Sequence, residues 1–160
     1  MSKILLFRNY LLGIIFTVFL IIAVSCAQDG KIKEVDRFSV CPDSPNCVSS
    51  LAEPQDEIHF IPPLNLSLEL PDAFIKVRTL LEDHADGSIV VLEENSYIHA
   101  VFTSKIMRFK DDVEFRFQAQ QDGGTLIDIK SRSRLGYSDL GVNRTRMEDI
   151  RSSLKGKIVP

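Results

Sequence analysis

The chain lacks the short motifs that mark the common catalytic sites. Its 160 residues contain no Gly-x-Ser-x-Gly elbow, no His-Glu-x-x-His helix and no glycine-rich phosphate loop. Its three histidines, His59, His84 and His99, are scattered, and none stands beside a cysteine. Because tetrahedral zinc requires four ligands, we expect no metal site, and we expect no cofactor. The sequence therefore names no reaction and favours a non-catalytic protein, with an enzyme as the alternative.

The chain also lacks an excess of positive charge. After residue 25 it carries 17 basic and 22 acidic side chains, which gives a net charge of −5. This balance argues against general binding to nucleic acid. The charge is uneven, because residues 26–124 sum to −9 and residues 125–160 sum to +4. The basic end could face an anion, or it could offset acidic groups of the same fold.

Long hydrophobic runs are absent except at the start of the chain. The run from Tyr10 to Val24 carries no charge and follows the basic residues Lys3 and Arg8. Its length of about 15 residues suits the hydrophobic region of a signal peptide, whereas a helix that crosses a bilayer needs about 20. We therefore predict a signal peptide at residues 1–25.

The Ala-Val-Ser-Cys sequence at residues 23–26 resembles a bacterial lipobox. The resemblance implies that Cys26 becomes the acylated first residue of the mature chain, and several acyl chains give stable anchoring. An ordinary cleaved signal peptide and an uncleaved helix at residues 4–24 are the alternatives. We predict a lipidated tether at residues 26–37 and a single domain at residues 38–160, on the periplasmic or outer-surface side of the cell envelope.

Cys41 and Cys47 are the remaining cysteines, and the turn-forming sequence Pro-Asp-Ser-Pro-Asn separates them. Outside the cytoplasm such a pair most simply forms a disulfide. Closing so small a loop would stabilise the fold by about 2 kcal/mol in the chain-entropy model. Free or redox-active thiols and a metal site are the alternatives.

Hydrophobic periodicity predicts the helices and strands. We expect a helix from residues 71–72 to about residues 86–87, because Phe74, Val77 and Leu81 form an apolar stripe. Residues 88–92 predict a short strand, and residues 58–61 predict an edge strand among prolines. From residue 97 the period is two, as in half-buried strands. The alternating apolar positions are Ile98, Ala100, Phe102 and Ile106, then Val113, Phe115 and Phe117, then Ile127 and Ile129.

The strands within residues 111–133 are expected to form a hairpin. A three-residue loop at residues 122–124 would place Phe117 opposite Ile129 and Glu114 opposite Arg132. A C-terminal helix should begin near residues 138–139 or 142–143 and end about Leu154, because Met147, Ile150 and Leu154 form its apolar stripe. The element order predicts an α+β fold, an antiparallel sheet of about four to five strands with helices packed on one face.

Residues suited to chemistry gather between this hairpin and the last helix. The candidate network comprises Asp111, Asp112, Glu114, Arg132, Arg134, Asp139, Asn143 and Arg144, with Arg146 beside them. Guanidinium groups suit bidentate pairing with carboxylates or phosphates. The network is either a structural lock between acids and arginines or an anion site near the helix start, for a lipid head group or an acidic metabolite. By alternation, Arg132 belongs to the polar face with Glu114, whereas Ser131 and Ser133 turn inward.

Three sequence blocks are distinctive: CPDSPNCVSS at residues 41–50, FKDDVEF at residues 109–115 and SRSRLGYSDLGVNR at residues 131–144. Together they resemble the signature of the bacterial and plastid family called domain of unknown function 1499 (DUF1499), over residues 38–155. The resemblance implies export or membrane anchoring, which family members often show. It supplies no catalytic residue.

We expect an exported, lipid-anchored envelope protein that attaches to the membrane through the lipid on Cys26. Its expected role is that of a non-catalytic binding or structural module. Its partner would be an anionic small molecule, a lipid or an envelope protein. The alternatives are an envelope hydrolase or transferase and a carrier of an anionic or lipidic ligand. Each alternative would use Arg132, Arg134 and Arg144, and a carrier would also need a cavity between the apolar sheet face and the helices.

Overall fold

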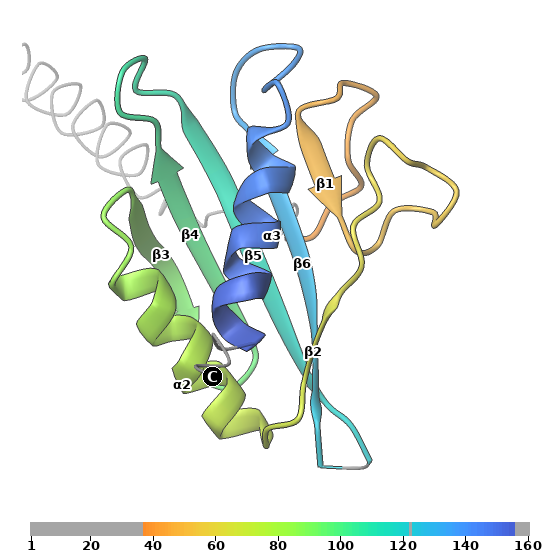
Figure 1. Cartoon of the computed structure of the whole chain (residues 1–160), viewed down its shortest axis with the longest axis vertical. Coiled ribbons are helices and arrows are strands. Elements are labelled where there is room, and N and C mark those ends of the chain that lie inside the picture. The colour runs from red at the N-terminus through yellow and green to blue at the C-terminus, as the bar shows by residue number, and fades with distance from the viewer. Residues whose placement is uncertain (1–36, 122, 156–160) are drawn as a thin grey trace, which may run out of the picture. The chain divides into compact units, whose positions relative to one another are not determined.

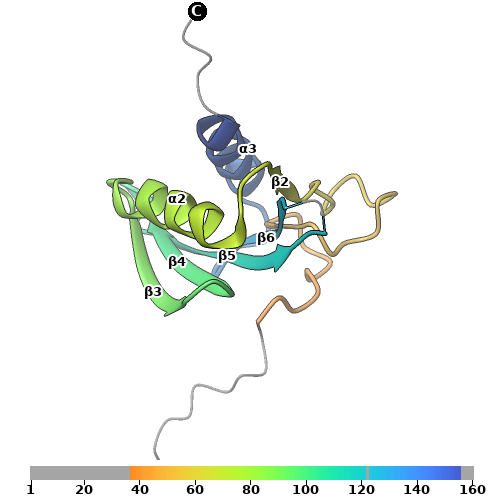
Figure 2. The same ribbon diagram turned by 90° about the horizontal axis from the view of Figure 1, so that it is seen from below.

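The computed structural model describes residues 37–121 and 123–155, so the predicted signal peptide and all of the tether except Arg37 lie outside the described residues. An antiparallel sheet carries two helices on one face, which confirms the predicted α+β class (Figures 1 and 2). The strands are β1 (Cys47–Ser49), β2 (Leu64–Leu66), β3 (Gly87–Glu93), β4 (Tyr97–Thr103), β5 (Lys110–Ala119) and β6 (Thr125–Ser133), and the helices are α2 (Leu70–Glu82) and α3 (Val142–Lys155). The strand order is β1-β6-β5-β4-β3, and β2 also pairs with β6. The sheet therefore has six strands, slightly more than the predicted number.

Helix α2 forms where the sequence predicts it. Proline is tolerated in the first turn because its missing N–H would have no partner there, and Asp72 lies near the positive helix end. The predicted stripe faces the sheet, and the ring of Phe74 packs edge-on against Phe117 with 5.1 Å between centroids. The helix ends at Glu82, four residues before the predicted end, and a turn leads directly into β3.

The period-two pattern correctly identifies the central strands and their buried face. Residues such as Ile98, Val113 and Phe115 have no exposed surface and form the core with the apolar stripes of both helices. Ile106 is an exception, because β4 ends at Thr103 and the Ile106 side chain is 91% exposed. The chain turns instead, with the Ser104 N–H donating to the Phe109 carbonyl at 2.9 Å.

The predicted register of the β5–β6 hairpin is wrong by two residues. Phe117 lies opposite Ile127, and Glu114 lies opposite Lys130. The Gln120 N–H donates to the Gly124 carbonyl at 2.8 Å, and Gly123 takes the left-handed conformation at φ +84°. The three-residue turn with a left-handed glycine thus exists, one position earlier than predicted. A shift of two keeps every side chain on its predicted face.

The edge strand predicted at residues 58–61 is also wrong. Phe60 makes only an isolated bridge to Ser49, and β2 begins after Pro62 and Pro63. Prolines have no N–H to give to a ladder, so regular pairing with β6 starts only at Leu64. Strands β1 and β2 pair with successive parts of the same side of β6.

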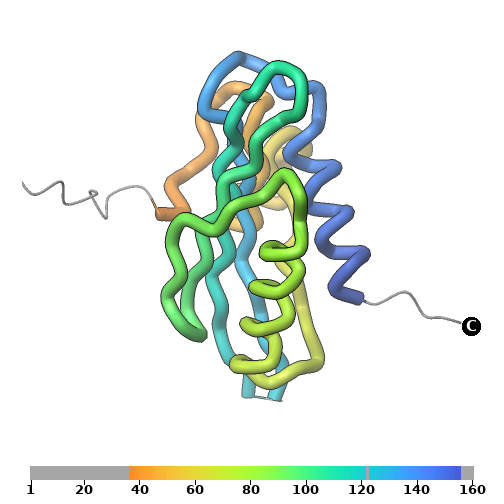
Figure 3. The backbone as a smooth tube through the Cα atoms, turned by 90° about the vertical axis from the view of Figure 1, so that its left-hand side faces the viewer, coloured from red at the N-terminus to blue at the C-terminus, as the bar shows by residue number. Residues whose placement is uncertain are grey.

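Helix α3 begins at the later of its two predicted starts and buries its predicted apolar stripe beside α2 (Figure 2). The first described residues run along the opposite face of the sheet. The β4–β5 loop (residues 104–109) and the β6–α3 loop (residues 134–141) lie side by side at one end of the molecule, as Figures 1 and 3 both show. This end is where the candidate residues collect.

Candidate functional site

Alternation along β5 divides the predicted network between the two faces of the sheet. Asp111 is buried under α3 and pairs with Arg146. Its neighbour Asp112 points to the other face and pairs with Arg134, because successive strand residues face opposite sides. Glu114 shares the face of Asp112. The corner that the sequence predicts is therefore two separate clusters with the sheet between them.

On the helix side, Arg146 of α3 is the centre of a buried polar cluster. Its Nη2 donates to Asp111 Oδ2 at 2.6 Å, and its Nη1 donates to Asn143 Oδ1 at 2.8 Å and Ser131 Oγ at 3.2 Å. Asn143, only 1% exposed, donates in turn to Ser133 Oγ at 2.9 Å. The two serines turn inward as predicted. The cluster fixes α3 to the ends of β5 and β6.

On the opposite face, Asp112 is held by two donors. Arg134 binds both its carboxylate oxygens, from Nε at 2.8 Å and from Nη2 at 2.7 Å, and His99 Nε2 lies 2.7 Å from Oδ1. Burial alone would raise the pKa of Asp112. The hydrogen bonds from Arg134 and His99 outweigh burial, so the pKa of Asp112 lies well below its ordinary value.

Glu114 lies deeper on the same face, where the first described residues cover it. Its carboxylate is 3.4 Å from Lys130 Nζ and accepts hydrogen bonds from the Tyr97 hydroxyl at 2.6 Å and the Phe38 N–H at 2.9 Å. Burial, and then the hydrogen bond to Glu114, raise the pKa of Tyr97. The expected cross-strand partner Arg132 is replaced by Lys130 because of the register shift. This cluster attaches the first described residues to the sheet.

The remaining members of the predicted network lie apart from one another. Arg132 is paired through its backbone in β6, but its side chain forms no hydrogen bond or ion pair with the described part of the chain. Arg144 Nη2 donates to the two backbone carbonyls of residues 57–58, at 3.1 and 3.0 Å. Asp139 caps α3, because its Oδ2 accepts the Asn143 N–H at 2.7 Å. The arginines at positions 132, 134 and 144 thus have separate surroundings and do not converge on one anion.

The predicted disulfide between Cys41 and Cys47 is present. Cys47 begins β1, whose partner is β6, and the preceding residue, Asn46, accepts hydrogen bonds at its carbonyl from the Asn143 side chain at 3.1 Å and the Ser133 N–H at 2.9 Å. The disulfide loop is therefore joined to the helix-side cluster. Cys26, the predicted lipidation site, lies outside the described residues.

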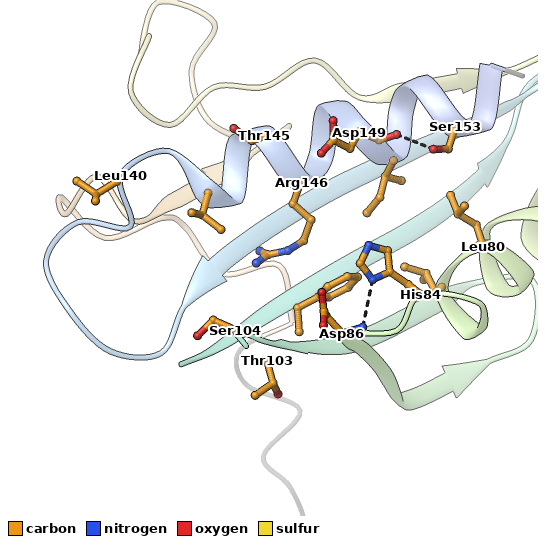
Figure 4. A pocket seen from close by; sticks show the side chains of 14 residues that line it. Leu80, His84, Asp86, Thr103, Ser104, Leu140, Thr145, Arg146, Asp149 and Ser153 are labelled. Atoms are coloured by element: carbon orange, nitrogen blue, oxygen red, sulfur yellow. Dashed lines mark hydrogen bonds between the residues drawn. The ribbon is translucent and has the colours of Figure 1, made fainter. Parts of the chain in front are cut away.

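A groove of about 400 Å³ opens between α2, α3 and the end of β4. Figure 4 shows the Arg146 side chain leaving α3 on the side that lines the groove, with His84, which follows α2, across from α3. Both side chains contact the ring of Phe102: the Arg146 guanidinium carbon lies 4.9 Å from its centroid, and the His84 ring lies edge-on at 4.9 Å. The apolar lining consists of Leu80, Leu81, Phe102, Leu140, Val142 and Ile150, and the polar lining of His84, Asp86, Thr103, Ser104, Thr145, Arg146, Asp149 and Ser153.

Arg146 keeps one donor for the groove. Its hydrogen bonds are all made by Nη1 and Nη2, and Nε donates none of them. No fully buried side-chain nitrogen or oxygen in the described ranges lacks a partner, so Nε keeps some exposure within a side chain that is 13% exposed. The groove therefore has the nearly buried ring of Phe102 at its base, with the Arg146 guanidinium and the His84 ring against it.

Sequence analysis missed this groove, because its lining comes from segments that only the helix packing brings together. In the sequence His84 is one of three scattered histidines, and Arg146 stands beside the predicted network. Within residues 37–121 and 123–155, no group of three histidine, cysteine, aspartate or glutamate side chains could hold a metal ion. In the same ranges, no helix has both the length and the apolar character needed to cross a bilayer.

Comparison with known proteins identifies the family. The model for the family described as protein of unknown function (DUF1499) matches residues 37–154. The chain belongs to the DUF1499 family. The resemblance of the three sequence blocks is thereby confirmed. A search of curated proteins gives no match for this DUF1499 protein.

Among solved structures, the crystal structure of CalU16 from Micromonospora echinospora is similar to part of this DUF1499 protein. The two chains are 13% identical, the match covers 59% of this chain and 73% of CalU16, and the TM-score is 0.41. A similarity this low supports no inference about function.

Proposed function

We propose that this DUF1499 protein is an exported, lipid-anchored module of the cell envelope that binds a small, neutral, amphipathic molecule without transforming it. The observation that carries the proposal is the groove between α2 and α3, where Arg146 lies against the ring of Phe102 and its Nε makes no hydrogen bond within the described residues. Its volume of about 400 Å³ lies within the range typical of small-molecule sites. Its mixture of apolar walls with a few polar groups is also typical of such sites.

The charges around the groove favour a neutral ligand over an anionic one. The positive charge of Arg146 is balanced by Asp111 at 2.6 Å. Asp86 and Asp149 add two further carboxylates to the lining, and Lys105 Nζ lies 3.7 Å from Asp86. A carboxylate or phosphate ligand would meet these acids at close range. An ester, amide or alcohol can accept the Arg146 Nε–H without that cost.

The hydrogen bonds in the groove favour binding over catalysis. Nucleophilic catalysis needs a hydroxyl or thiol within reach of a base. The Ser104 hydroxyl accepts the Phe109 N–H at 3.0 Å, and the Ser153 hydroxyl donates to the Asp149 carbonyl at 2.9 Å. His84 Nδ1 accepts the backbone N–H of Asp86 at 3.4 Å. Neither serine is therefore paired with this histidine.

Export and anchoring are supported by the lipobox-like sequence at Cys26 and by the disulfide, which suits an oxidising compartment. The mass of the N-terminal peptide of the mature protein tests this half of the proposal. We expect Cys26 to be the first residue and to carry acyl chains. Cys26→Ser should leave an unacylated protein in the soluble fraction, and an unmodified Cys26 in the wild-type protein would refute anchoring.

Neighbouring serines on α3 give a matched test of the groove. Ser153 lines the groove, whereas Ser152 is exposed on the same helix and does not. The neutral fluorescent probe N-phenyl-1-naphthylamine should bind the wild type and Ser152→Phe equally, and Ser153→Phe at least about tenfold more weakly, a loss of about 1.4 kcal/mol. A neutral monoacylglycerol should displace the probe more effectively than a fatty acid of equal chain length. Equal affinity of the two variants would refute the groove as the binding site.

A further inference from the structure

One end of the molecule exposes an unusual number of large apolar side chains. The loops at residues 104–109 and 134–141 carry Ile106, Met107, Phe109, Leu135, Tyr137 and Leu140, which are between 47% and 94% exposed. Single exposed hydrophobic residues are normal on protein surfaces, but a cluster marks a site of interaction. We define these six residues as the apolar tip.

The two loops lie next to each other and have defined conformations. Ser104 and Leu140 line the same end of the groove, and the Arg134 N–H donates to the Lys110 carbonyl at 3.0 Å (Figure 4). Within the first loop, the Phe109 N–H donates to Ser104 Oγ at 3.0 Å. Hydrogen bonds therefore hold the two loops in shape while their apolar side chains point outward.

The backbone at the apolar tip adopts conformations that bulky residues avoid. Arg108 and Leu140 have φ angles of 56° and 57°, in the left-handed region. Such residues cost free energy and persist where the surroundings fix them, often at functional positions. Leu140 combines this backbone with a side chain that is 94% exposed, so no packing inside the fold accounts for a leucine there.

The charge around the apolar tip differs from that of the rest of the chain. Residues 104–109 carry Lys105 and Arg108 and no acid, and residues 134–141 carry one basic and one acidic residue, which gives +2 for the two loops. Lys110, the first residue of β5, follows directly. The chain after residue 25 has a net charge of −5. Apolar side chains with basic residues beside them suit the surface of a bilayer that contains anionic lipids.

We propose that the apolar tip is a membrane-contact surface that inserts into the interface of a bilayer containing anionic phospholipids. This inference rests on the proposed anchoring through Cys26. Ten residues, 27–36, separate the anchor from the described domain, and a fully extended chain of that length spans at most about 35 Å. The tether therefore confines the domain near the membrane, where its high effective concentration makes even a weak contact form.

Insertion of the apolar tip would let a ligand enter the groove directly from the bilayer. Leu140 and Ser104 belong both to the loops and to the groove lining. With the apolar tip in the interface, the adjoining end of the groove lies beside the lipid head groups. An amphipathic molecule could then pass from the bilayer into the groove without crossing water.

Tryptophan insertion tests the proposal directly, because the chain contains no tryptophan. Leu140→Trp and Ile106→Trp place a unique fluorophore in each loop, and Ile75→Trp places one at a 57% exposed site in the first half of α2, away from the loops (Figure 1). The full-length processed protein is mixed with vesicles of phosphatidylcholine and phosphatidylglycerol that contain a doxyl-labelled quencher lipid. We expect quenching and a shift to shorter emission wavelength for the two loop variants and neither change for Ile75→Trp.

Two charge-reversal variants test whether basic residues contribute to vesicle binding. Arg108→Glu in the Leu140→Trp background should weaken vesicle binding by about tenfold or more, because each basic residue near an anionic surface contributes about 1 kcal/mol. Lys76→Glu, an equal charge reversal on the exposed face of α2, should have little effect. Equal binding to vesicles of phosphatidylcholine alone would overturn the role of anionic lipid.

The outcomes separate this inference from the proposed function. Quenching at neither loop in a protein whose Cys26 peptide is acylated would overturn membrane contact and leave anchoring intact. Loop quenching in a protein without acyl chains would support membrane contact and refute anchoring alone. A concentration-dependent emission shift of Leu140→Trp without vesicles, and none on adding them, would identify the surface as a self-association site and overturn the proposal.

Discussion

Replacing Arg146 by methionine should destabilise the fold more than the loss of any other arginine in the predicted network. The side chain of Arg146 is 13% exposed and that of Asp111 is 7% exposed. Arg146 also donates hydrogen bonds from Nη1 to Asn143 and Ser131. Methionine keeps much of the length of the side chain and its contact with the Phe102 ring but leaves the Asp111 carboxylate buried without a cation.

Burial sets the size of the expected loss. Removing one partner of a buried ion pair costs about 3–5 kcal/mol, because the other charge stays desolvated. Arg146 lines the groove and its side chain is 13% exposed, so we expect a value at the lower end of this range, about 3 kcal/mol. With a urea dependence of about 2 kcal/mol per molar, the unfolding midpoint should fall by about 1.5 M.

Urea unfolding followed by circular dichroism measures the effect, with two comparison variants. Arg144→Met removes a guanidinium that binds only two loop carbonyls, and it should cost about 1 kcal/mol or less. The double variant Asp111→Leu with Arg146→Met removes both charges, and it should be more stable than Arg146→Met alone. If Arg146→Met costs no more than Arg144→Met, and the double variant recovers nothing, the buried pair is not what fixes α3 to the sheet.

Three further outcomes follow from the clusters. Asn143→Ala should cost about 2–3 kcal/mol in unfolding free energy, because it leaves buried partners unsatisfied, whereas Asn65→Ala at an exposed strand position should cost less than about 0.5 kcal/mol. Reduction of the Cys41–Cys47 disulfide should lower stability by about 2 kcal/mol, measured as a fall in melting temperature that a double serine variant reproduces without reductant. The pKa of Asp112 is lower in the folded protein, so its contribution to stability is complete above pH about 5 and is lost as the pH falls. Asp112→Asn should therefore reduce the fall in unfolding free energy between about pH 5 and lower pH. An unchanged pH dependence would contradict the pairing.

The sequence predicts the faces of the sheet better than the pairs across it. Burial is decided by alternation, which Val113, Phe115 and Phe117 display plainly. Register depends on which of two adjacent glycines, Gly123 or Gly124, takes the left-handed position, and both are compatible with the composition of the turn. Moving the turn by one residue moves the pairing by two, so the faces are correct although the pairs are not.

The candidate network was grouped by closeness in sequence, and that is why it divides in the structure. Asp111 and Asp112 are neighbours in the chain, but they belong to different clusters on opposite sides of the sheet. The groove could not be predicted for the opposite reason. His84 and Arg146 are far apart in the sequence, and only the packing of both helices on the ring of Phe102 brings them together.

Arg146 belongs both to the buried cluster and to the groove, and this links ligand binding to stability. Its Nη atoms hold the ends of β5 and β6 against α3, and its side chain lines the groove with Nε making no hydrogen bond within the described residues. A molecule that accepts the Nε–H binds only when the guanidinium is held in this position, which means only in the folded state. Binding must then stabilise the fold by RT ln(1 + [L]/Kd), about 2.7 kcal/mol at a hundredfold excess over Kd. The melting temperature of the wild type should therefore rise with ligand concentration, and that of Ser153→Phe should rise less at the same concentration.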